Sequence, residues 1–301
     1  MQSRKTYDII FSNNYALKKG TIMDNKLCIY SKPYPKINSN FDKIDCAAEH
    51  NLVGVECFNN LDFATPDEEC AKRMKEYADT KNIIFPCFSA YVDFATGNYN
   101  EIVEKLKGYA RVTKILGCPY LHHTIIAEFC DPEKVLPFKN EYYNKGIQGV
   151  REVYDYAESI GVRTIYEDQG YIFNGVEGFG NFLADVNRNV GVVADFGNVY
   201  ESCDNITDFI KAFKDKICHA HVKDMLLTDE KPDGVIMKSL NGMYVKEVHP
   251  GEGSVDFKGA IRLLKEMNYD GYFGVEYCVD DDNSPLFVEA LDFVKKIMKE
   301  V

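Results

Sequence analysis

Four side chains that can bind a metal ion each follow a short apolar run of the sequence. Glu167, Asp195, His221 and Glu276 come directly after such runs. Three carboxylates and one imidazole nitrogen suit a divalent ion such as Mn²⁺, Mg²⁺ or Co²⁺ better than an ion that prefers thiolates. If the runs are parallel strands lying side by side, their polar ends converge at one edge of a sheet and could hold one ion. A hydrogen-bonded polar cluster without a metal is the alternative.

Other side chains that could take part in chemistry lie near these positions. His122 and His123 end a further apolar run, and the alternation of side chains along a strand sends one of them inward and the other outward. The inward histidine could be an additional base or a hydrogen-bond donor to a hydroxyl group of the substrate. Equally, it could be a packed, hydrogen-bonded core residue. Lys223 could bind a phosphate or a hydroxyl group, or lie on a solvated rim. His249 could line the same site, or be a loop histidine without a role.

The elements that would position these side chains alternate regularly along the chain. Strands are predicted at residues 26–30, 53–57, 83–88, 120–124, 163–166, 191–194, 218–222 and 273–277, with amphipathic helical segments between them. Eight strand and helix units in about 250 to 300 residues predict a (β/α)8 TIM barrel. A doubly wound open sheet is the competing architecture. The barrel is favoured because an open sheet would spread four neighbouring strand ends over roughly 15 Å, too far for one metal.

The chain is predicted to be one domain, residues 1–301, with residues 1–25 as an N-terminal extension. Thr65-Pro-Asp-Glu68 has the pattern of a capping box at a helix start, and Ser284-Pro285 opens the last helix in a similar way. Gly161 is expected to end the helical pattern of residues 141–160.

One connection is longer than a strand-to-helix link requires. Residues 225–248 lie between the predicted seventh strand and the sequence His249-Pro-Gly-Glu-Gly253. Long loops at the carboxyl ends of barrel strands are usually lids or binding loops. We therefore expect this segment to cover the pocket and to select the substrate.

Composition excludes several classes of protein. A formal net charge of -12 opposes binding to nucleic acid, which requires a basic surface. The 10 cysteines include no C-x-x-C pair and read as small core residues of a reducing compartment. The chain contains neither a signal-peptide pattern nor about 18 consecutive apolar residues. These observations predict a cytoplasmic protein that does not bind membranes.

In the segments around these polar residues, the sequence resembles the xylose-isomerase-like barrel superfamily, in its ketose 3-epimerase and sugar-phosphate isomerase/epimerase branch. The resemblance covers nearly the whole chain after residue 25. The matching segments are Tyr166-Glu-Asp168, Ala194-Asp-Phe-Gly-Asn198, His219-Ala-His-Val-Lys-Asp224, Pro250-Gly-Glu-Gly-Ser-Val-Asp-Phe257 and Gly274-Val-Glu276.

The resemblance implies that Glu167, Asp195, His221 and Glu276 hold one divalent ion, with Mn²⁺ preferred over Co²⁺ or Mg²⁺, and that the two glutamates are acid and base. The expected activity is isomerisation or epimerisation of a keto-sugar through removal of a proton next to the carbonyl. Two departures put the substrate in doubt. Asn198 stands where the epimerases usually carry histidine, and the segment 225–248 stands where they carry an arginine.

Three further functions compete with the isomerase. The same fold and metal set serves lyases, namely keto-sugar dehydratases and the large subunits of C-glycoside deglycosidases, which expel a β-substituent from a 3-keto-glycoside. The related apurinic endonucleases are disfavoured, because they use additional histidines, one of them where this chain has Asn198, and because an acidic chain binds DNA poorly. A non-catalytic sugar-binding protein would keep the metal ligands but show no turnover. The expected partner is a small sugar or glycoside, and the chain is expected to be a homo-oligomer, or a hetero-oligomer with a small subunit if it is a deglycosidase.

Overall fold

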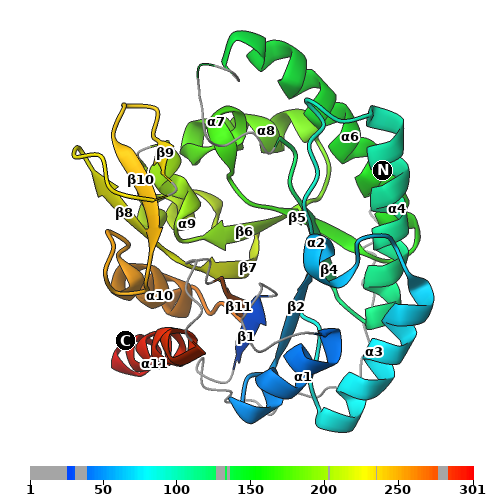
Figure 1. Ribbon diagram of the computed structural model, residues 1–301. Helices are drawn as coiled ribbons and strands as arrows, with labels where there is room; N and C mark the ends of the chain where they lie inside the picture. Colours follow the sequence, from blue (N-terminus) through cyan, green and yellow to red (C-terminus); the bar gives the residue numbers. More distant parts are fainter. Residues whose placement is uncertain are drawn as a thin grey trace, which may run out of the picture.

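The computed structural model describes residues 26–30, 39–126, 133, 136–202, 204–234, 236–276 and 284–301. Within these residues, eight parallel strands close into a barrel in the order β1-β11-β7-β6-β5-β4-β3-β2, and helices surround it (Figure 1). The barrel strands are β1 (Leu27–Tyr30), β2 (Gly54–Phe58), β3 (Phe88–Ala90), β4 (Tyr120–His123), β5 (Arg163–Tyr166), β6 (Gly191–Asp195), β7 (Ile217–Val222) and β11 (Tyr272–Val275). The predicted (β/α)8 barrel is confirmed. The expected extension, residues 1–25, lies outside the described residues.

Helices surround the barrel, and the longer ones are amphipathic and pack their apolar faces against it. They are α1 (Asn40–Glu49), α2 (Asn59–Asp62), α3 (Glu68–Lys81), α4 (Tyr99–Leu116), α6 (Lys139–Ser159), α7 (Gly170–Phe173), α8 (Gly175–Val186), α9 (Ile206–Phe213), α10 (Phe257–Glu266) and α11 (Ser284–Glu300), with 3-10 turns η2 (Leu136–Phe138) and η3 (Asn198–Glu201). The large apolar core lies in this layer between strands and helices. A second, small apolar cluster is formed by Cys87, Ile165 and Val193, on β5, β6 and the segment before β3. None of the described helices is long and apolar enough to cross a membrane.

Most predicted boundaries agree with the structure, and two differ. The predicted strand at 83–88 pairs as β3 only from Phe88, because Pro86 has no N–H to donate to a ladder. Helix α3 begins at Glu68 rather than at Pro66, since the Asp67 side chain caps it by accepting the Cys70 N–H at 2.8 Å. Gly161 ends α6 as predicted, with a φ of 79°.

The long segment after β7 is not an irregular loop. It forms a three-stranded antiparallel sheet, which we call the hairpin sheet, and which projects from one side of the barrel beside α9 and α10 (Figure 1). Its strands are β8 (Asp224–Thr228), β9 (Met237–Lys238) and β10 (Tyr244–Val248). β8 and β10 pair along their whole length, from Asp224 with Val248 to Thr228 with Tyr244.

One buried carboxylate fixes the base of the hairpin sheet. Asp224 accepts hydrogen bonds from the backbone N–H groups of Met225, Gly251, Gly253 and Val255, at 2.8 to 3.2 Å. A side chain at position 253 would place a Cβ only 2.1 Å from the Asp224 carboxylate, so this position requires glycine. The Pro250-Gly-Glu-Gly segment therefore holds the sheet at the mouth of the barrel.

Candidate metal centre

The four predicted metal-binding side chains meet at the carboxyl ends of β5, β6, β7 and β11. His221 Nδ1 lies 2.8 Å from Glu167 Oε2, 3.6 Å from Asp195 Oδ2 and 3.8 Å from Glu276 Oε2. The first three side chains are buried, and Glu276 is 12% exposed. Since neighbouring parallel strands end at the same edge of the barrel, closure of the sheet produces this convergence.

The charges of this cluster fit a divalent cation. Asp195 Oδ1 accepts the backbone N–H groups of Gly197 and Asn198, both at 2.8 Å, which leaves Oδ2 toward the cluster. Asp195 Oδ2 is buried and makes no hydrogen bond within the described residues; its nearest cation is Lys223 Nζ, at 3.2 Å. Three carboxylates thus face the ammonium group of Lys223 and the ring of His221. Burial lowers the pKa of His221, but Glu56, Asp195 and Glu167 hold it well above its ordinary value. The remaining negative charge in this buried site needs further neutralisation. An oxygen-rich donor set with one imidazole suits Mn²⁺, Co²⁺, Mg²⁺ or Zn²⁺.

Electrostatics keep the cluster charged. Burial raises the pKa of Glu167, but His122, His221 and Lys223 outweigh it and hold this pKa below its ordinary value. Burial lowers the pKa of Lys223, but Asp195, Glu276 and Glu167 hold it well above its ordinary value. Lys223 Nζ also lies 3.5 Å from Glu276 Oε2. The lysine is therefore a fixed positive charge inside the site and not a solvated rim residue.

The two histidines at the end of β4 have different environments. His122 lines the cavity, and its Nε2 is buried without a hydrogen bond in the described residues, 3.7 Å from Glu167 Oε1. Burial lowers the pKa of His122, which favours the neutral ring. His123 points outward: Nδ1 contacts Thr124 O at 2.8 Å, and Nε2 contacts the Tyr166 hydroxyl at 2.8 Å.

Burial also lowers the pKa of His123, to about 3. Both of its ring nitrogens are engaged in the layer between strands and helices. The predicted catalytic role therefore narrows to His122, and for His123 the geometry gives a packing role.

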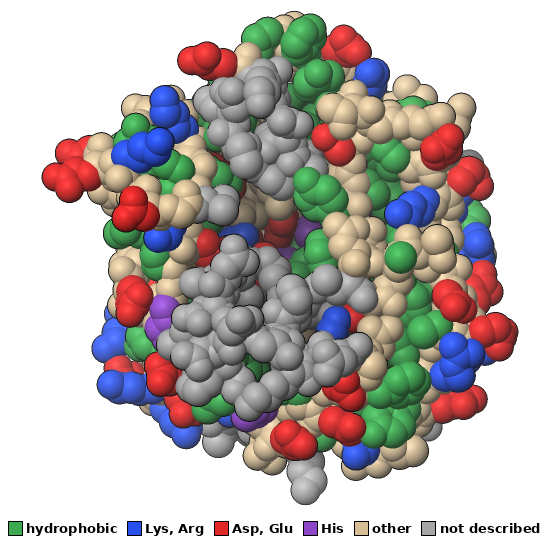
Figure 2. All heavy atoms as spheres, in the orientation of Figure 1, with side chains coloured by type: hydrophobic (Ala, Val, Ile, Leu, Met, Phe, Trp, Pro, Cys, Tyr) green, Lys and Arg blue, Asp and Glu red, His purple; other side chains and the backbone are tan. Residues whose placement is uncertain are grey.

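A cavity of about 250 Å³ opens over the cluster. Charged and histidine side chains are visible in a central hollow of this face (Figure 2). Asn198 and Lys223 line the cavity, as expected of substrate-binding residues, and the described lining does not include His249. Asn198 Nδ2 is buried and has no partner in the described residues, so it is available to a polar ligand. The hairpin sheet supplies Met225, Met237 and Glu247 to the lining, as expected of a segment that covers the pocket.

Sequence reasoning missed several polar residues of the site. Glu56 and Ser89 lie inside the barrel beneath the cluster, and Asp168 and Glu201 lie beside it; all are buried. A glutamate within a run predicted to be a buried strand was an available signal for Glu56. Glu201 follows Asp195 by six residues on a 3-10 turn, a position that no sequence pattern marks.

Glu201 is a carboxyl group with unusual proton affinity. Burial raises its pKa to about 7, and the nearby charges of Asp195 and Glu167 act in the same direction against the opposing effects of Lys223 and the Gly170 N–H. Its Oε2 accepts the Gly170 N–H at 2.9 Å, and the residue lines the cavity. Burial likewise raises the pKa of Asp168 well above its ordinary value. Two carboxyl groups whose pKa is raised therefore lie beside Glu167, whose pKa is lowered.

Comparison with known proteins agrees with this geometry. Residues 44–297 match the model of the xylose isomerase-like TIM barrel family, and the chain belongs to this family. Over 210 residues it is 28% identical to an inosose isomerase of Halalkalibacterium halodurans, an overlap of 67% of this chain and 70% of that protein. It is 26% identical over 168 residues to an inosose dehydratase of Clostridium botulinum, an overlap of 53% of each chain.

Among solved structures, the IolI protein with a bound zinc atom shares the fold, with a TM-score of 0.68 and 22% identity over 91% of this chain and 97% of that one. Family membership and these relatives make the chain an enzyme, either an isomerase or epimerase or a lyase.

Proposed function

We propose that this protein is a metal-dependent isomerase or epimerase that moves a proton next to the carbonyl of a keto-sugar or a cyclic keto-polyol such as an inosose. The observation that carries the proposal is the convergence of Glu167 and Glu276 with Asp195 and His221 on one cavity. The names of the inosose isomerase and inosose dehydratase relatives support a keto-polyol as substrate. Mn²⁺ is the ion we propose, with Co²⁺, Mg²⁺ and Zn²⁺ as the alternatives that the same donors could hold.

The protein's own groups account for the proton transfer. Glu167 and Glu276 follow β5 and β11, which are separated in the barrel by β6 and β7, so they approach a substrate from different sides. One carboxylate can remove the proton from the carbon next to the carbonyl, and the other can return a proton to the opposite face or to the neighbouring carbon. A divalent ion bound by the four residues would polarise the substrate carbonyl. Lys223, held at the centre of the negative cluster, can donate hydrogen bonds to substrate oxygens as negative charge develops on them.

The proposal is tested by measuring the exchange of substrate protons with solvent. The purified protein, loaded with Mn²⁺, is incubated in D₂O with inososes and with keto-hexoses, and the products are followed by NMR. We expect deuterium to enter a carbon next to the carbonyl of a substrate that keeps all its oxygens. Glu167→Gln and Glu276→Gln should abolish this exchange. Metal-loaded protein that exchanges no proton and releases no product with either substrate class would overturn the proposal.

A second function, elimination, is favoured by Glu201. A dehydratase removes the same proton and then expels a hydroxide from the next carbon, which requires a proton donor for the leaving oxygen. A carboxyl group with a pKa near 7 that lines the cavity is suited to that task. In the same NMR experiment, elimination is recognised by loss of water from an inosose, or by release of the aglycone from a 3-keto-glycoside.

Glu201→Gln separates the two functions. The amide keeps the volume and can still accept the Gly170 N–H, but it cannot donate a proton as a carboxylic acid does. If the enzyme is a lyase, this variant should retain solvent exchange and lose elimination. If it is an isomerase, isomerisation should stay within a few-fold of the wild type.

A further inference from the structure

A continuous set of hydrogen bonds runs beneath the cavity floor and joins residues from β2, β3, β4 and β7. Glu56 is at its centre and is completely buried. Its Oε1 accepts the Ser89 hydroxyl at 2.8 Å and lies 2.9 Å from His221 Nε2. Its Oε2 lies 2.7 Å from His219 Nε2. On the far side of Ser89, the hydroxyl oxygen lies 3.0 Å from His122 Nδ1.

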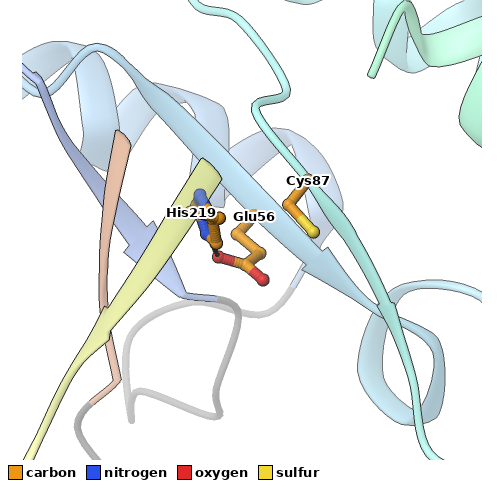
Figure 3. Close-up of side chains that lie close together, drawn as sticks. All are labelled: Glu56, Cys87 and His219. Atoms are coloured by element: carbon orange, nitrogen blue, oxygen red, sulfur yellow. Dashed lines mark hydrogen bonds and ion pairs between the residues drawn. The ribbon is translucent and has the colours of Figure 1, made fainter. Parts of the chain in front are cut away.

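These contacts form one hydrogen-bonded network and not a second metal centre. Glu56, Cys87 and His219 place donor atoms close together in the barrel interior, as three ligands of a metal would be (Figure 3). However, Glu56 and His219 already contact each other directly, and Ser89 and His221 engage the other carboxylate oxygen. Three donors satisfy one buried carboxylate, which is the arrangement that stabilises a charge in such an environment.

The direction of these hydrogen bonds determines where the imidazole protons lie. A serine hydroxyl has one hydrogen, and Ser89 gives it to Glu56, so Ser89 can only accept from His122. The hydrogen of a neutral His122 ring is then on Nδ1, and the lone pair is on Nε2. His221 donates from Nε2 to the Glu56 carboxylate, so Nδ1 is the nitrogen that faces Glu167, Asp195 and Glu276. Without a metal, Nδ1 donates to Glu167 Oε2 at 2.8 Å; a divalent ion bound there would take the place of that hydrogen.

We infer that Glu56 and Ser89 are positioning residues that set the tautomers of two histidines at once. By accepting the hydrogen of His221 Nε2, Glu56 leaves Nδ1 as the nitrogen that can bind the metal. Through Ser89 it also turns the lone pair of His122 into the cavity, where Nε2 accepts the hydrogen of a substrate hydroxyl. His122 Nε2 is suited to this role because it is buried, lines the cavity and has no hydrogen-bond partner in the described residues. The part of the inference that concerns the substrate rests on the proposed function; the part that concerns the tautomers does not.

The tautomers can be read without substrate. Full-length protein labelled with ¹⁵N-histidine gives two-bond ¹H–¹⁵N correlations that distinguish a protonated ring nitrogen from an unprotonated one. In the wild type we expect His122, assigned by its loss in His122→Gln, to have hydrogen on Nδ1 only. Ser89→Ala removes the acceptor of this hydrogen and should give a mixture of tautomers. Ser89→Thr keeps a hydroxyl and should restore the wild-type pattern.

The matched control is Cys87→Ala. It truncates a buried side chain on the segment leading into the same strand, beside Glu56, without removing a partner of His122. Its His122 signals should match the wild type. If Ser89→Ala does not fold, Ser89→Cys has nearly the same volume, offers a weaker acceptor and carries the same test. A His122 ring that keeps hydrogen on Nδ1 in the folded Ser89 variant would overturn the inference, whatever the enzyme proves to act on.

The second arm concerns the metal centre. Carboxylates behind a ligating histidine typically contribute 10- to 100-fold to metal affinity. Glu56→Gln should therefore weaken Mn²⁺ binding about 10- to 100-fold in calorimetric titration, whereas Ser89→Ala should leave it within about 3-fold of the wild type. With an active substrate, Ser89→Ala and His122→Gln should raise KM more than they lower kcat. Unchanged Mn²⁺ affinity in Glu56→Gln would show that Glu56 does not position His221.

Discussion

The barrel rim and the hairpin sheet meet over the same cavity, but they are built differently. At the rim, each of the four side chains of the candidate metal centre follows or ends a buried strand and is held by charged or backbone groups. The hairpin sheet is half-exposed and pairs mainly with itself. Hydrogen bonds also join it to the rim: the Tyr171 hydroxyl donates to Lys238 O at 2.6 Å, and Leu240 N donates to Glu201 O at 2.9 Å.

This difference suits two separate functions, proton transfer at the rim and substrate selection by the hairpin sheet. A rigid rim suits proton chemistry, in which small displacements of a base are costly. A separately built sheet that contributes Met225, Met237 and Glu247 to the lining suits the selection of substrates, because it can change without disturbing the metal centre. If the two functions are separate, changes at the rim should abolish proton transfer, and changes in the hairpin sheet should alter substrate binding.

The largest effect should come from the rim. Glu167→Gln and Glu276→Gln remove a base while keeping its volume, so solvent-proton exchange should fall by about 10²- to 10⁴-fold. Exchange is measured by NMR in D₂O, and circular dichroism checks the fold. Glu252→Gln, an exposed glutamate in the turn after β10, is the matched control and should exchange at the wild-type rate. Wild-type exchange in both rim variants would remove the glutamates from the mechanism.

The rim was predictable because its signal is local. A polar side chain directly after an apolar run can be read from sequence, and the closed sheet then brings such strand ends together without further information. The interior residues were harder. The role of Glu56 and Ser89 depends on hydrogen bonds between three strands, which join residue 56 to residues 89 and 221. No short segment of the sequence contains both partners of such a contact.

A smaller effect is expected from the hairpin sheet. Replacing residues 228–244 by a short Gly/Ser connection removes Met237 from the cavity and breaks both hydrogen bonds to the rim. We expect kcat/KM to fall roughly 10- to 100-fold, or discrimination between substrates to weaken by as much, with metal content near that of the wild type. A substitution confined to the exposed tip, residues 231–234, is the control. Loss of metal in the shortened protein, or unchanged turnover of every substrate, would refute the separation.

The hairpin sheet also shows the limit of the sequence prediction. Its position and length indicated a pocket-covering segment, but not its strands. β9 has only two residues, too few to show an alternation, and the β8–β10 pairing joins positions 16 (Thr228 with Tyr244) to 24 (Asp224 with Val248) residues apart, which no short window of sequence reveals. The start of α3 was misplaced for a related reason: both Thr65 and Asp67 are cap residues, and only the contact with Cys70 decides between them.

Glu201 lies where the two regions join, and it should make stability depend on pH. Its pKa is about 7 in the folded protein, against about 4.3 for an unperturbed glutamate. Between these values the folded state binds the proton more tightly than the unfolded state does. This contribution to stability is therefore present at low pH and is lost as the pH rises toward 7.

Glu201→Gln removes this dependence. In metal-free protein, the free energy of unfolding of Glu201→Gln relative to the wild type should increase by up to about 3 kcal/mol between pH 5 and pH 8. Urea unfolding at several pH values measures it, with Glu177→Gln, an exposed glutamate of α8, as control. If the wild type and Glu201→Gln give parallel curves, Glu201 is already ionised at neutral pH, and its role as proton donor in an elimination fails with it.

The smallest effect should come from one hydroxyl that ties the sheet to the rim. Tyr171→Phe deletes the donor to Lys238 O and keeps the ring in place. A hydrogen bond of this kind contributes about 0.5 to 1.5 kcal/mol, so the free energy of unfolding should fall by about that amount or less. Because the bond holds the hairpin sheet over the cavity, KM should also rise about 2- to 5-fold while kcat and metal content remain unchanged.

Tyr143→Phe is the matched control: its hydroxyl donates to Asp185 Oδ2 at 2.6 Å on the outer surface, away from the sheet. If the hydrogen bond from Tyr171 to the hairpin sheet contributes to substrate selection, KM changes in Tyr171→Phe and not in Tyr143→Phe. If the sheet is instead held in place by its own strand pairing and by Asp224, KM is the same in both variants.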